Sequence, residues 1–213
     1  MNSISTRGER LKKGSASRRV QNKLDLKRQI LQAAMTLFET HGYDGFSLRQ
    51  VAEAIGYSPT TIYLYFKDKD ELLFNIAYEG FRDFGLALQA AYDSSSDSHE
   101  RIWRIGRAYF DFGMNHPVHY RLMFMQRGEF LAQTAPTGYT DFVDSFSILT
   151  RALSEGMNEG KIKAFDPQMT GGLLWASLHG VVSLVLTNSH LPLETAEPLF
   201  AWQMQILQRE LRL

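Results

Sequence analysis

Apolar side chains recur along the chain at the three- and four-residue spacing of amphipathic helices, whereas alternating runs of Val, Ile and Thr are almost absent. Ile30, Ala34, Leu37 and Phe38 fall on one face of the first predicted helix, and Gly42 follows in the position of a helix-ending glycine. The pattern therefore predicts an all-α fold of about nine helices. Their predicted ranges are 24–41, 47–55, 58–66, 69–91, 98–115, 117–126, 139–159, 167–188 and 195–211.

Two of these helices are short, are clearly capped and enclose a glycine turn. Ser47 and Gln50 form a capping box at the start of the first one, which Gly56 ends. Ser58 caps the second one, and Pro59 occupies its first position, where a missing N–H costs nothing. This spacing is that of a helix-turn-helix, whose second helix enters the major groove of DNA, although the same hairpin also occurs as a plain packing unit.

Composition and charge narrow the class of protein. The chain has 213 residues, is 44% hydrophobic and carries no formal net charge, so it can form a core and is not expected to be disordered. It lacks cysteine, which excludes a disulfide scaffold, thiolate metal sites and a cysteine nucleophile. The charge is unevenly distributed, because residues 1–69 carry 12 Lys and Arg against 6 Asp and Glu, whereas residues 70–213 carry 11 against 17. A basic front third predicts a polyanionic partner, with chance segregation of surface charge as the alternative.

Neither a secretory leader nor a membrane span is expected. The first 23 residues contain no apolar stretch, so we expect a protein of the cytoplasm. The most apolar run, Leu173 to Leu186, has only about 14 residues, contains Ser177 and His179, and falls short of the roughly 20 that cross a bilayer. We interpret this run as a buried helix.

The segment 24–84 carries a series of residues at characteristic spacings. They are Ala33, Ala34, Leu37, Phe38, Gly42, Val51, Ala52, Ile55, Gly56, Tyr63, Tyr65, Phe66, Lys69 and Leu72. On these residues the segment, and above all the stretch from Phe46 to Leu73, resembles the DNA-binding domain of the tetracycline-repressor (TetR) family of bacterial regulators. The resemblance implies a basic flexible tail over 1–23, a helix-turn-helix DNA-binding domain over 24–84 and a ligand-binding and dimerisation domain over 85–213.

The resemblance also implies which residues contact double-stranded operator DNA. The hydroxyls of Thr60 and Thr61 stand near the start of the recognition helix, where they can reach bases or phosphates, and the phenols of Tyr63 and Tyr65 stand at the groove wall. Arg49 matches a position that can reach a base, where an Arg fork suits guanine, although a solvated surface charge is the alternative. The predicted DNA-binding residues are Ser47, Arg49, Ser58, Thr60, Thr61, Tyr63, Tyr65, Lys69 and Arg28.

Other positions in this segment have a second interpretation or depart from the family pattern. Ser47 and Lys69 match positions that contact the DNA backbone, but Ser47 is also needed as a helix cap. Leu64 stands where many relatives carry a polar or basic side chain, so a DNA contact is expected to be missing there. Cations of the tail can compensate, with a merely solubilising tail as the alternative. These cations are Arg18, Arg19, Lys23, Lys27 and Arg28.

The second domain resembles the family less closely. Trp175-Ala-Ser-Leu-His179-Gly180 is similar to the Trp-His-Gly (WHG) signature of one type of C-terminal domain in the family. Trp175 and His179 are four residues apart and therefore share a helix face that can line a pocket. Gly172 and Gly180 are expected to let another helix approach closely.

Aromatic and sulfur-containing side chains concentrate in the middle helices, where most of them must form core. A few are expected to line a pocket for an unidentified effector that is small and largely apolar, with His179, Tyr120 or Arg121 fixing its orientation. The predicted ligand-binding residues are Tyr109, Tyr120, Phe124, Phe146, Trp175 and His179.

A homodimer through the last two helices is a further implication of the resemblance, in which two helices from each subunit form a four-helix bundle. The helix predicted over 167–188 is apolar nearly all round, which indicates burial by its own domain and by a partner. The last helix carries two apolar stripes, and a single wide core face is the alternative. These stripes are Leu199, Trp202 and Ile206, and Phe200, Leu207 and Leu211.

Together these features predict a DNA-binding transcriptional regulator, most simply a repressor that a ligand releases from a pseudo-palindromic operator. The alternative is a ligand-independent DNA-organising protein on the same scaffold. An enzyme is not expected, because a Gly-rich phosphate loop, a His-Glu-x-x-His motif and a nucleophile elbow are missing from the sequence. No cofactor or metal is expected either, since His116 and His119 fit a surface pair better than a metal site.

Overall fold

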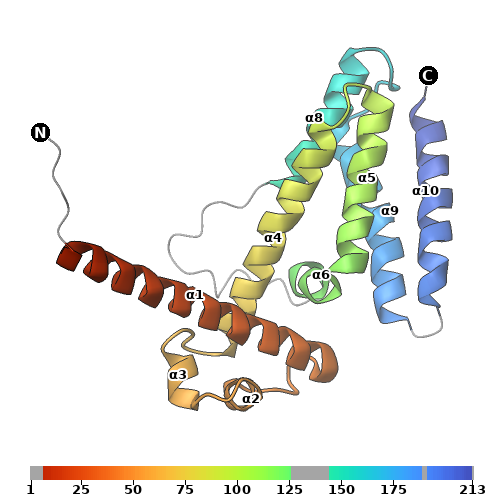
Figure 1. Cartoon of the computed structure of the whole chain (residues 1–213). Coiled ribbons are helices and arrows are strands. Elements are labelled where there is room, and N and C mark those ends of the chain that lie inside the picture. The colour runs from red at the N-terminus through yellow and green to blue at the C-terminus, as the bar shows by residue number, and fades with distance from the viewer. Residues whose placement is uncertain (1–6, 126–143, 189–190, 213) are drawn as a thin grey trace, which may run out of the picture. The chain divides into compact units, whose positions relative to one another are not determined.

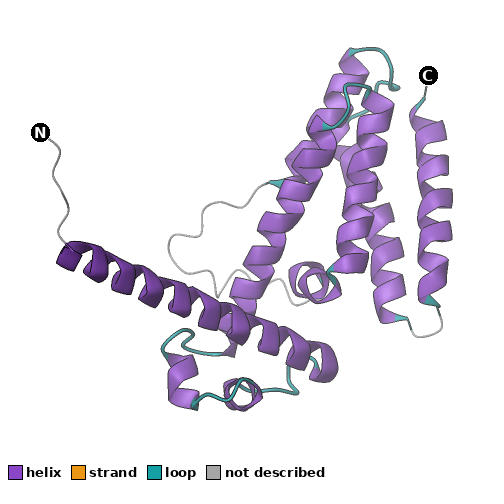
Figure 2. Cartoon of the chain, in the orientation of Figure 1, coloured by secondary structure: helices purple, strands orange, loops and turns teal. Residues whose placement is uncertain are grey.

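The computed structural model describes residues 7–125, 144–188 and 191–212, and for residues 7–16 it describes the backbone alone. Helices make up nearly all of this part of the chain, and its β-pairing is limited to one isolated bridge between Ile162 and Arg212 (Figures 1 and 2). The predicted all-α class is therefore confirmed. The helices are α1 (Arg7–His41), α2 (Leu48–Ala54), α3 (Pro59–Tyr63), α4 (Lys69–Asp93), α5 (Ser98–Asn115), α6 (Pro117–Phe124), α8 (Ser145–Asn158), α9 (Pro167–Thr187), the 3₁₀ turn η1 (Leu193–Thr195) and α10 (Ala196–Leu211).

The largest difference from the predicted elements is the start of α1. The apolar pattern placed its first residue at 24, and residues 1–23 were expected to form a flexible tail, but the helix begins at Arg7 and is 35 residues long. Arg, Lys, Gln and Leu are good helix formers, and proline is missing from this stretch, so the helix propagates beyond the turns that pack. The apolar spacing identified only the turns of α1 that pack against the rest of the first unit, because turns that do not pack need no apolar face.

Two further predictions about helix ends need comment. The recognition helix ends at Tyr63 and not near residue 66, because the N–H groups of Leu64 and Tyr65 bond to carbonyls three residues back and tighten the chain into a turn. Residues 139–143 of the helix predicted over 139–159 lie outside the described residues, and α8 occupies Ser145–Asn158.

The chain divides into two compact units after Ile76, within α4. In the first unit α1 packs on α2 and α2 packs on α3, around a buried apolar core. Its most deeply buried side chains are Ile30, Ala34, Val51, Ala52, Ile62, Phe66, Leu72, Leu73, Phe74 and Ile76. Half of them belong to the spaced series on which the family resemblance rests, so part of that series describes a core. These are Ala34, Val51, Ala52, Phe66 and Leu72.

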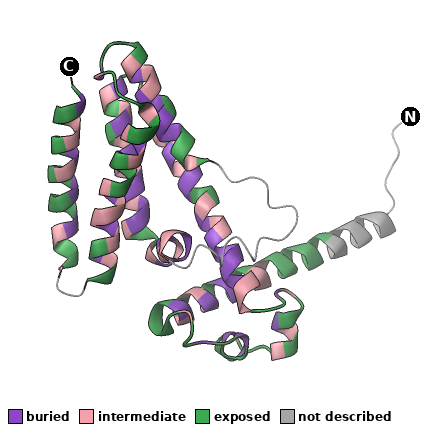
Figure 3. Cartoon of the chain, turned by 180° about the vertical axis from the view of Figure 1, so that it is seen from behind, coloured by how far each residue is buried: buried purple, intermediate pink, exposed green. Residues whose placement is uncertain are grey.

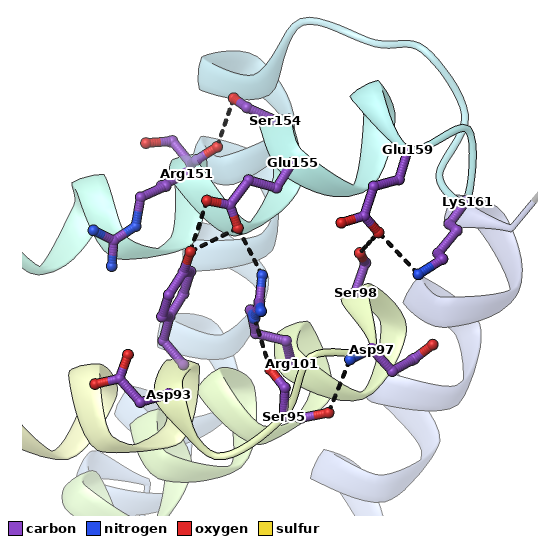
Figure 4. A network of polar contacts seen from close by, with 12 residues as sticks. Asp93, Ser95, Asp97, Ser98, Arg101, Arg151, Ser154, Glu155, Glu159 and Lys161 are labelled. Atoms are coloured by element: carbon purple, nitrogen blue, oxygen red, sulfur yellow. Dashed lines mark hydrogen bonds and ion pairs between the residues drawn. The ribbon is translucent and has the colours of Figure 1, made fainter.

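In the second unit α5, α8, α9 and α10 lie side by side (Figure 1). A polar network ties one end of this bundle together (Figure 4). The Glu155 carboxylate of α8 accepts hydrogen bonds from the Tyr92 hydroxyl of α4 at 2.6 and 2.7 Å and from Arg101 of α5 at 2.6 Å. One turn further on, the Ser98 hydroxyl donates to Glu159 at 2.7 Å, and Lys161 pairs with the same carboxylate at 2.9 Å. The C-terminal end of α8 is thus fixed to α4 and α5.

Helix α9 is only partly covered within its own chain. Within the described ranges it is the one helix that is long and apolar enough to cross a membrane by length and composition, yet only 28% of its most apolar window is buried. The single chain therefore supplies only part of the burial predicted for this helix, which was expected from its own domain and from a partner. Figure 3 shows exposed and half-buried positions along much of α9 and α10.

Candidate functional site

The first candidate site is the pair of short helices in the first unit. The Ser58 hydroxyl accepts a hydrogen bond from the Thr61 N–H at 3.3 Å, and Pro59 follows at the first position of α3, as predicted. The turn before it is closed by a bond of 2.9 Å from the Tyr57 N–H to the Ala52 carbonyl. Gly56 within the turn has φ +73°, a left-handed conformation that favours glycine. Sequence and structure agree on this helix-turn-helix.

The recognition helix α3 is only one and a half turns long and buries Ile62 alone. Thr60, Tyr63 and Leu64 share its outer face at spacings of three and four residues, and Tyr63 and Leu64 are 57% and 77% exposed. Thr61 and Tyr65 are half-buried. The outer face therefore offers one hydroxyl, one phenol and one large apolar side chain to a partner.

Two predicted residues stand at the start of α2. Arg49 is exposed at its second position. Ser47 caps the helix, but the capping box differs from the predicted form: the Ser47 hydroxyl lies 3.0 Å from Oε1 of Gln50 and accepts only a long bond of 3.4 Å from the Gln50 N–H. Ser47 and Arg49 are both exposed, so both side chains are accessible to a partner.

Lys69, predicted as a phosphate contact, is held by its own unit. Its Nζ donates to the carbonyl oxygens of Tyr43 at 2.6 Å and Phe46 at 3.4 Å, and it lies 4.4 Å from the centre of the Tyr43 ring. The Tyr43 hydroxyl in turn donates to Asp70, and this hydrogen bond to a carboxylate raises the tyrosine pKa to about 12. Lys69 therefore fastens the loop between α1 and α2. Sequence reasoning missed this arrangement because its partners are backbone carbonyls.

Among the cations of α1, one is bound within the first unit and others are exposed on its surface. Lys27 donates to Oδ1 of the buried Asn75 at 3.0 Å and lies 5.8 Å from the centre of the Phe66 ring, so it is largely committed to the unit's own packing. Arg28 is exposed and makes a loose pair of 3.5 Å with Asp25. Arg18, Arg19 and Lys23 are exposed along the same helix.

The second candidate site is a cavity of about 660 Å³ in the second unit. Four of the six predicted ligand-binding residues line it: Tyr109, Phe124, Phe146 and Trp175. Sequence reasoning missed the contributions of α4, none of whose residues was among the predicted ligand-binding residues. The other lining residues are Phe81, Phe84, Leu88, Ile102, Ile105, Gly106, Asp144, Ser145, Leu149, Gly172, Leu174, Leu178 and Met204.

Tyr120 and His179, the other two predicted residues, do not line the cavity but stand behind its wall. The Tyr120 hydroxyl lies 2.8 Å from the Tyr109 hydroxyl and 2.7 Å from Nδ1 of His179, and Nδ1 lies 3.3 Å from the Tyr109 hydroxyl. We call these three side chains the hydroxyl relay. Burial raises the pKa of both tyrosines and lowers the pKa of His179, so all three groups are neutral near pH 7.

Aromatic rings surround the hydroxyl relay. The Phe124 ring lies 6.3 Å from Tyr109, 5.7 Å from Phe84 and 6.5 Å from Trp175, centre to centre. The Trp175 ring stacks on His179 at 5.6 Å. The predicted shared face of Trp175 and His179 is thus present, with Trp175 reaching the cavity and His179 supporting it from behind.

The close approach expected at Gly172 and Gly180 does not occur within this chain. At both positions an added Cβ would meet nothing within 4 Å in the described part of the chain, so the expectation can hold only for a helix of another subunit. Within the chain, close approach occurs at Gly113 and Gly171, where Cβ atoms would lie 2.4 Å from Val182 and 2.9 Å from Thr150.

Arg121, considered as an orienting group for the ligand, is engaged elsewhere. Its guanidinium donates to the Leu186 carbonyl at 2.7 Å, near the C-terminal end of α9. This bond satisfies one of the carbonyls that a helix end leaves unpaired. For metals, no group of three or more His, Asp or Glu side chains suited to bind an ion is found in the described ranges.

Two capped helices around a glycine turn, with a guanidinium, a hydroxyl and a phenol on their outer faces, define a helix-turn-helix protein that binds DNA. Residues 30–76 match the model for bacterial regulatory proteins of the tetR family, and residues 102–207 match the model for the tetracyclin repressor-like C-terminal domain. The chain belongs to the TetR family of bacterial regulatory proteins. The WHG type of C-terminal domain stays a prediction.

Individual relatives agree with this assignment. The HTH-type transcriptional regulator YfiR of Bacillus subtilis is 30% identical over 152 residues, which cover 67% of this chain and 70% of YfiR. RutR of Escherichia coli K12, another HTH-type transcriptional regulator, is 29% identical over 167 residues, covering 77% of this chain and 76% of RutR. The crystal structure of the regulator FadR from Bacillus subtilis in complex with stearoyl-CoA has a TM-score of 0.71 at 20% identity, covering 87% of this chain and 99% of FadR. The protein is a DNA-binding transcriptional regulator.

Proposed function

We propose that this regulator is a homodimeric repressor that leaves a pseudo-palindromic operator when a small, largely apolar ligand binds. The observation that carries the proposal is the cavity of about 660 Å³, which lies in the same chain as the helix-turn-helix and is lined almost entirely by apolar side chains. A volume of this size suits a drug-sized ligand. A protein that only organised DNA would not need an apolar cavity, so the cavity favours the sensing role over that alternative.

The proposed DNA-binding surface comprises the outer face of α3 and the start of α2. Thr60 and Tyr63 would contact bases or phosphates, and Arg49 would reach a base edge from α2. Ser47, Ser58, Thr61 and Tyr65 would serve mainly by holding the two helices in position, since each is a cap or is half-buried. Lys69 and Arg28 would add positive charge near the phosphates. On this proposal the DNA-binding domain is the segment predicted over 24–84.

The proposed dimer interface is the exposed apolar face of α9 and α10. Along α9, Met169, Leu173 and Leu184 are 77%, 64% and 54% exposed, and Gly180 has open space on the same side. On α10, Trp202 is 67% exposed and belongs with Leu199 and Ile206 to one of the two predicted apolar stripes. The two helices pack on each other and therefore form one apolar surface, which a second copy of the chain would cover in a four-helix bundle.

Coupling between ligand and operator would pass along α4. Phe81, Phe84 and Leu88 of this helix line the cavity, while Leu72 and Ile76 of the same helix are core residues of the first unit. A ligand that favours one arrangement of α4 changes the spacing of the two recognition helices in the dimer, and linkage requires that operator DNA weakens ligand binding by the same factor. FadR, which shares this fold, was solved with stearoyl-CoA, a ligand with a long apolar chain.

We further propose that the protein has no catalytic activity and works in the cytoplasm. Its relatives are transcriptional regulators. The exposed apolar face of α9 would be covered by the partner subunit and not by lipid.

The first experiment is the selection of bound sequences from a random DNA pool, carried out with the purified protein at two salt concentrations. A single palindrome retained at the higher salt supports a specific dimeric regulator. Binding that depends on salt but not on sequence would contradict the proposal and favour the DNA-organising role.

A further inference from the structure

The described part of the cavity wall carries almost no charge. Of the residues that line it in the described part of the chain, Asp144 alone is ionisable with a formal charge near pH 7. Asp144 is exposed and caps α8 by accepting a hydrogen bond from the Ser147 N–H at 3.2 Å, so its charge faces water and a helix N-terminus. A ligand carboxylate would therefore meet no Lys, Arg or His of the described lining.

One of the lining residues, Tyr109, is deeply buried at 4% exposed and carries a hydroxyl. Tyr109 is the one member of the hydroxyl relay that lines the cavity, and the relay continues from its hydroxyl through the Tyr120 hydroxyl to Nδ1 of His179. In a cavity of this kind a few polar groups fix the orientation of an otherwise apolar ligand.

The relay can run in two directions because a neutral imidazole has two tautomers. With Nδ1 as acceptor, Tyr120 donates to His179 and Tyr109 donates to Tyr120. The indole N–H of Trp175 then uses one lone pair of the Tyr109 oxygen, and the other is left for a ligand. With Nδ1 as donor, each bond of the relay reverses and the Tyr109 O–H is left for a ligand. One hydroxyl can thus serve a ligand that donates a hydrogen bond or a ligand that accepts one, and neither case requires a charge.

We propose that the effector is an uncharged apolar molecule with a single hydrogen-bonding oxygen, such as a phenol, alcohol or ketone, and that the Tyr109 hydroxyl binds this oxygen. Tyr120 and His179 act as positioning residues, since they reach the ligand only through Tyr109. This inference rests on the proposed function, because it assigns the chemistry of the ligand that the cavity would bind. An anionic ligand is disfavoured, because its charge would lose hydration against the described lining without gaining a cationic partner. A cation would meet only Asp144 among the described lining residues, and this carboxylate already caps α8.

The test compares molecules that differ in one group. Equilibrium dialysis measures the binding of 4-hexylphenol, hexylbenzene, 4-hexylbenzoate and (4-hexylbenzyl)trimethylammonium to the full-length protein. We expect the phenol to bind at least about tenfold more tightly than either ion. Tyr109→Phe should lower the ratio of phenol affinity to hexylbenzene affinity by about 3- to 10-fold, the worth of one hydrogen bond. The matched control Tyr92→Phe, whose hydroxyl bonds to Glu155 outside the cavity wall, should leave this ratio unchanged.

A second variant keeps the test decisive if Tyr109→Phe does not fold. Tyr120→Phe leaves the Tyr109 hydroxyl in place but breaks the relay, so it should also lower the ratio, whereas a merely structural role would weaken phenol and hexylbenzene equally. An unchanged ratio in both variants, tightest binding of an ion, or no binding of any of the four compounds overturns the inference. If the phenol binds as expected but leaves operator affinity unchanged, the assigned ligand chemistry stands and the proposed regulation by ligand fails.

Discussion

Nδ1 of His179 lies 2.7 Å from the hydroxyl oxygen of Tyr120, and the two rings stack with their centres 5.7 Å apart. The contact joins the short helix α6 to the long helix α9 across 59 residues of sequence. Tyr120 has no exposed surface, so water cannot replace the bond if it is lost.

Tyr120→Phe is therefore expected to destabilise the protein by about 1 to 3 kcal/mol, because the substitution leaves an imidazole nitrogen of the half-buried His179 with a poorer partner. The free energy of unfolding in urea measures the effect. Tyr57→Phe is the control, since Tyr57 is 45% exposed and its substitution should change stability by less than about 0.5 kcal/mol. Equal stability of the two variants would contradict the role given to the relay.

Stability should fall as the pH drops below about 6.5, the usual histidine value. Burial lowers the pKa of both His119 and His179, and for His119 the neighbouring His116 acts in the same direction. The unfolded chain then binds protons at a higher pH than the folded chain does, so the free energy of unfolding decreases as pH falls through this range. Carboxylates with lowered pKa values, such as Glu159, lose their contribution only at lower pH.

Urea unfolding at pH 5.5, 6.5 and 7.5 tests this expectation. His119→Gln should make the decrease between pH 7.5 and pH 5.5 smaller than in the parent protein. A protein that is equally stable or more stable at pH 5.5 would show that these two histidines do not govern the pH dependence.

Arg49→Ala should weaken binding to the selected operator by about 1 to 3 kcal/mol, or about 5- to 150-fold, with a much smaller effect on scrambled DNA. The reason is that a base contact carries sequence preference, whereas a phosphate contact does not. Fluorescence anisotropy with both DNAs measures the difference. The matched control is Arg104→Ala, which removes an arginine paired with Glu100 within α5. A loss of equal size on both DNAs would assign Arg49 to the phosphates.

Leu64→Lys should increase affinity for any DNA and make binding more dependent on salt. Leu64 is 77% exposed on the outer face of α3, and an ammonium there can reach a phosphate. Each new phosphate contact steepens the plot of log K against log salt by about 0.9. An unchanged slope would mean that this position does not face the DNA backbone.

Leu173→Glu combined with Trp202→Glu should convert the dimer to monomers, because both side chains are exposed on the apolar face of α9 and α10. Sedimentation equilibrium measures the molecular mass, and operator affinity should fall in parallel. Leu86→Glu is the control, since Leu86 is 59% exposed on α4 and lies outside that face. A double variant that stays dimeric would show that the dimer interface lies on another surface of the protein.

Sequence patterns predicted those parts of the fold that local chemistry determines. Ser58 followed by Pro59, and Asp166 followed by Pro167, gave the starts of α3 and α9 to within a residue, because a cap and an N-terminal proline act within one turn. The beginning of α1 at Arg7 was missed, since the turns there carry no apolar face from which a pattern could be recognised.

Contacts between distant elements were largely beyond sequence reasoning. Trp175 was placed correctly in the cavity wall because its helix face follows from periodicity. His179 shares that face but stands behind the wall, a difference that depends on where α6 packs. Lys69 was expected at a phosphate, and nothing in the sequence signals the backbone carbonyls of Tyr43 and Phe46 that hold it.

The polar network at Glu155 has a kinetic consequence for the cavity. It anchors the C-terminal end of α8, whereas Asp144, Ser145 and Phe146 at the other end of the same helix line the cavity. We expect the backbone amides of the first turn of α8 to exchange with deuterium faster than those of its last turn. An effector that contacts Phe146 should then slow deuterium exchange in the first turn of α8 more than in its last turn, so the loosely held end of one helix would report that the cavity is occupied.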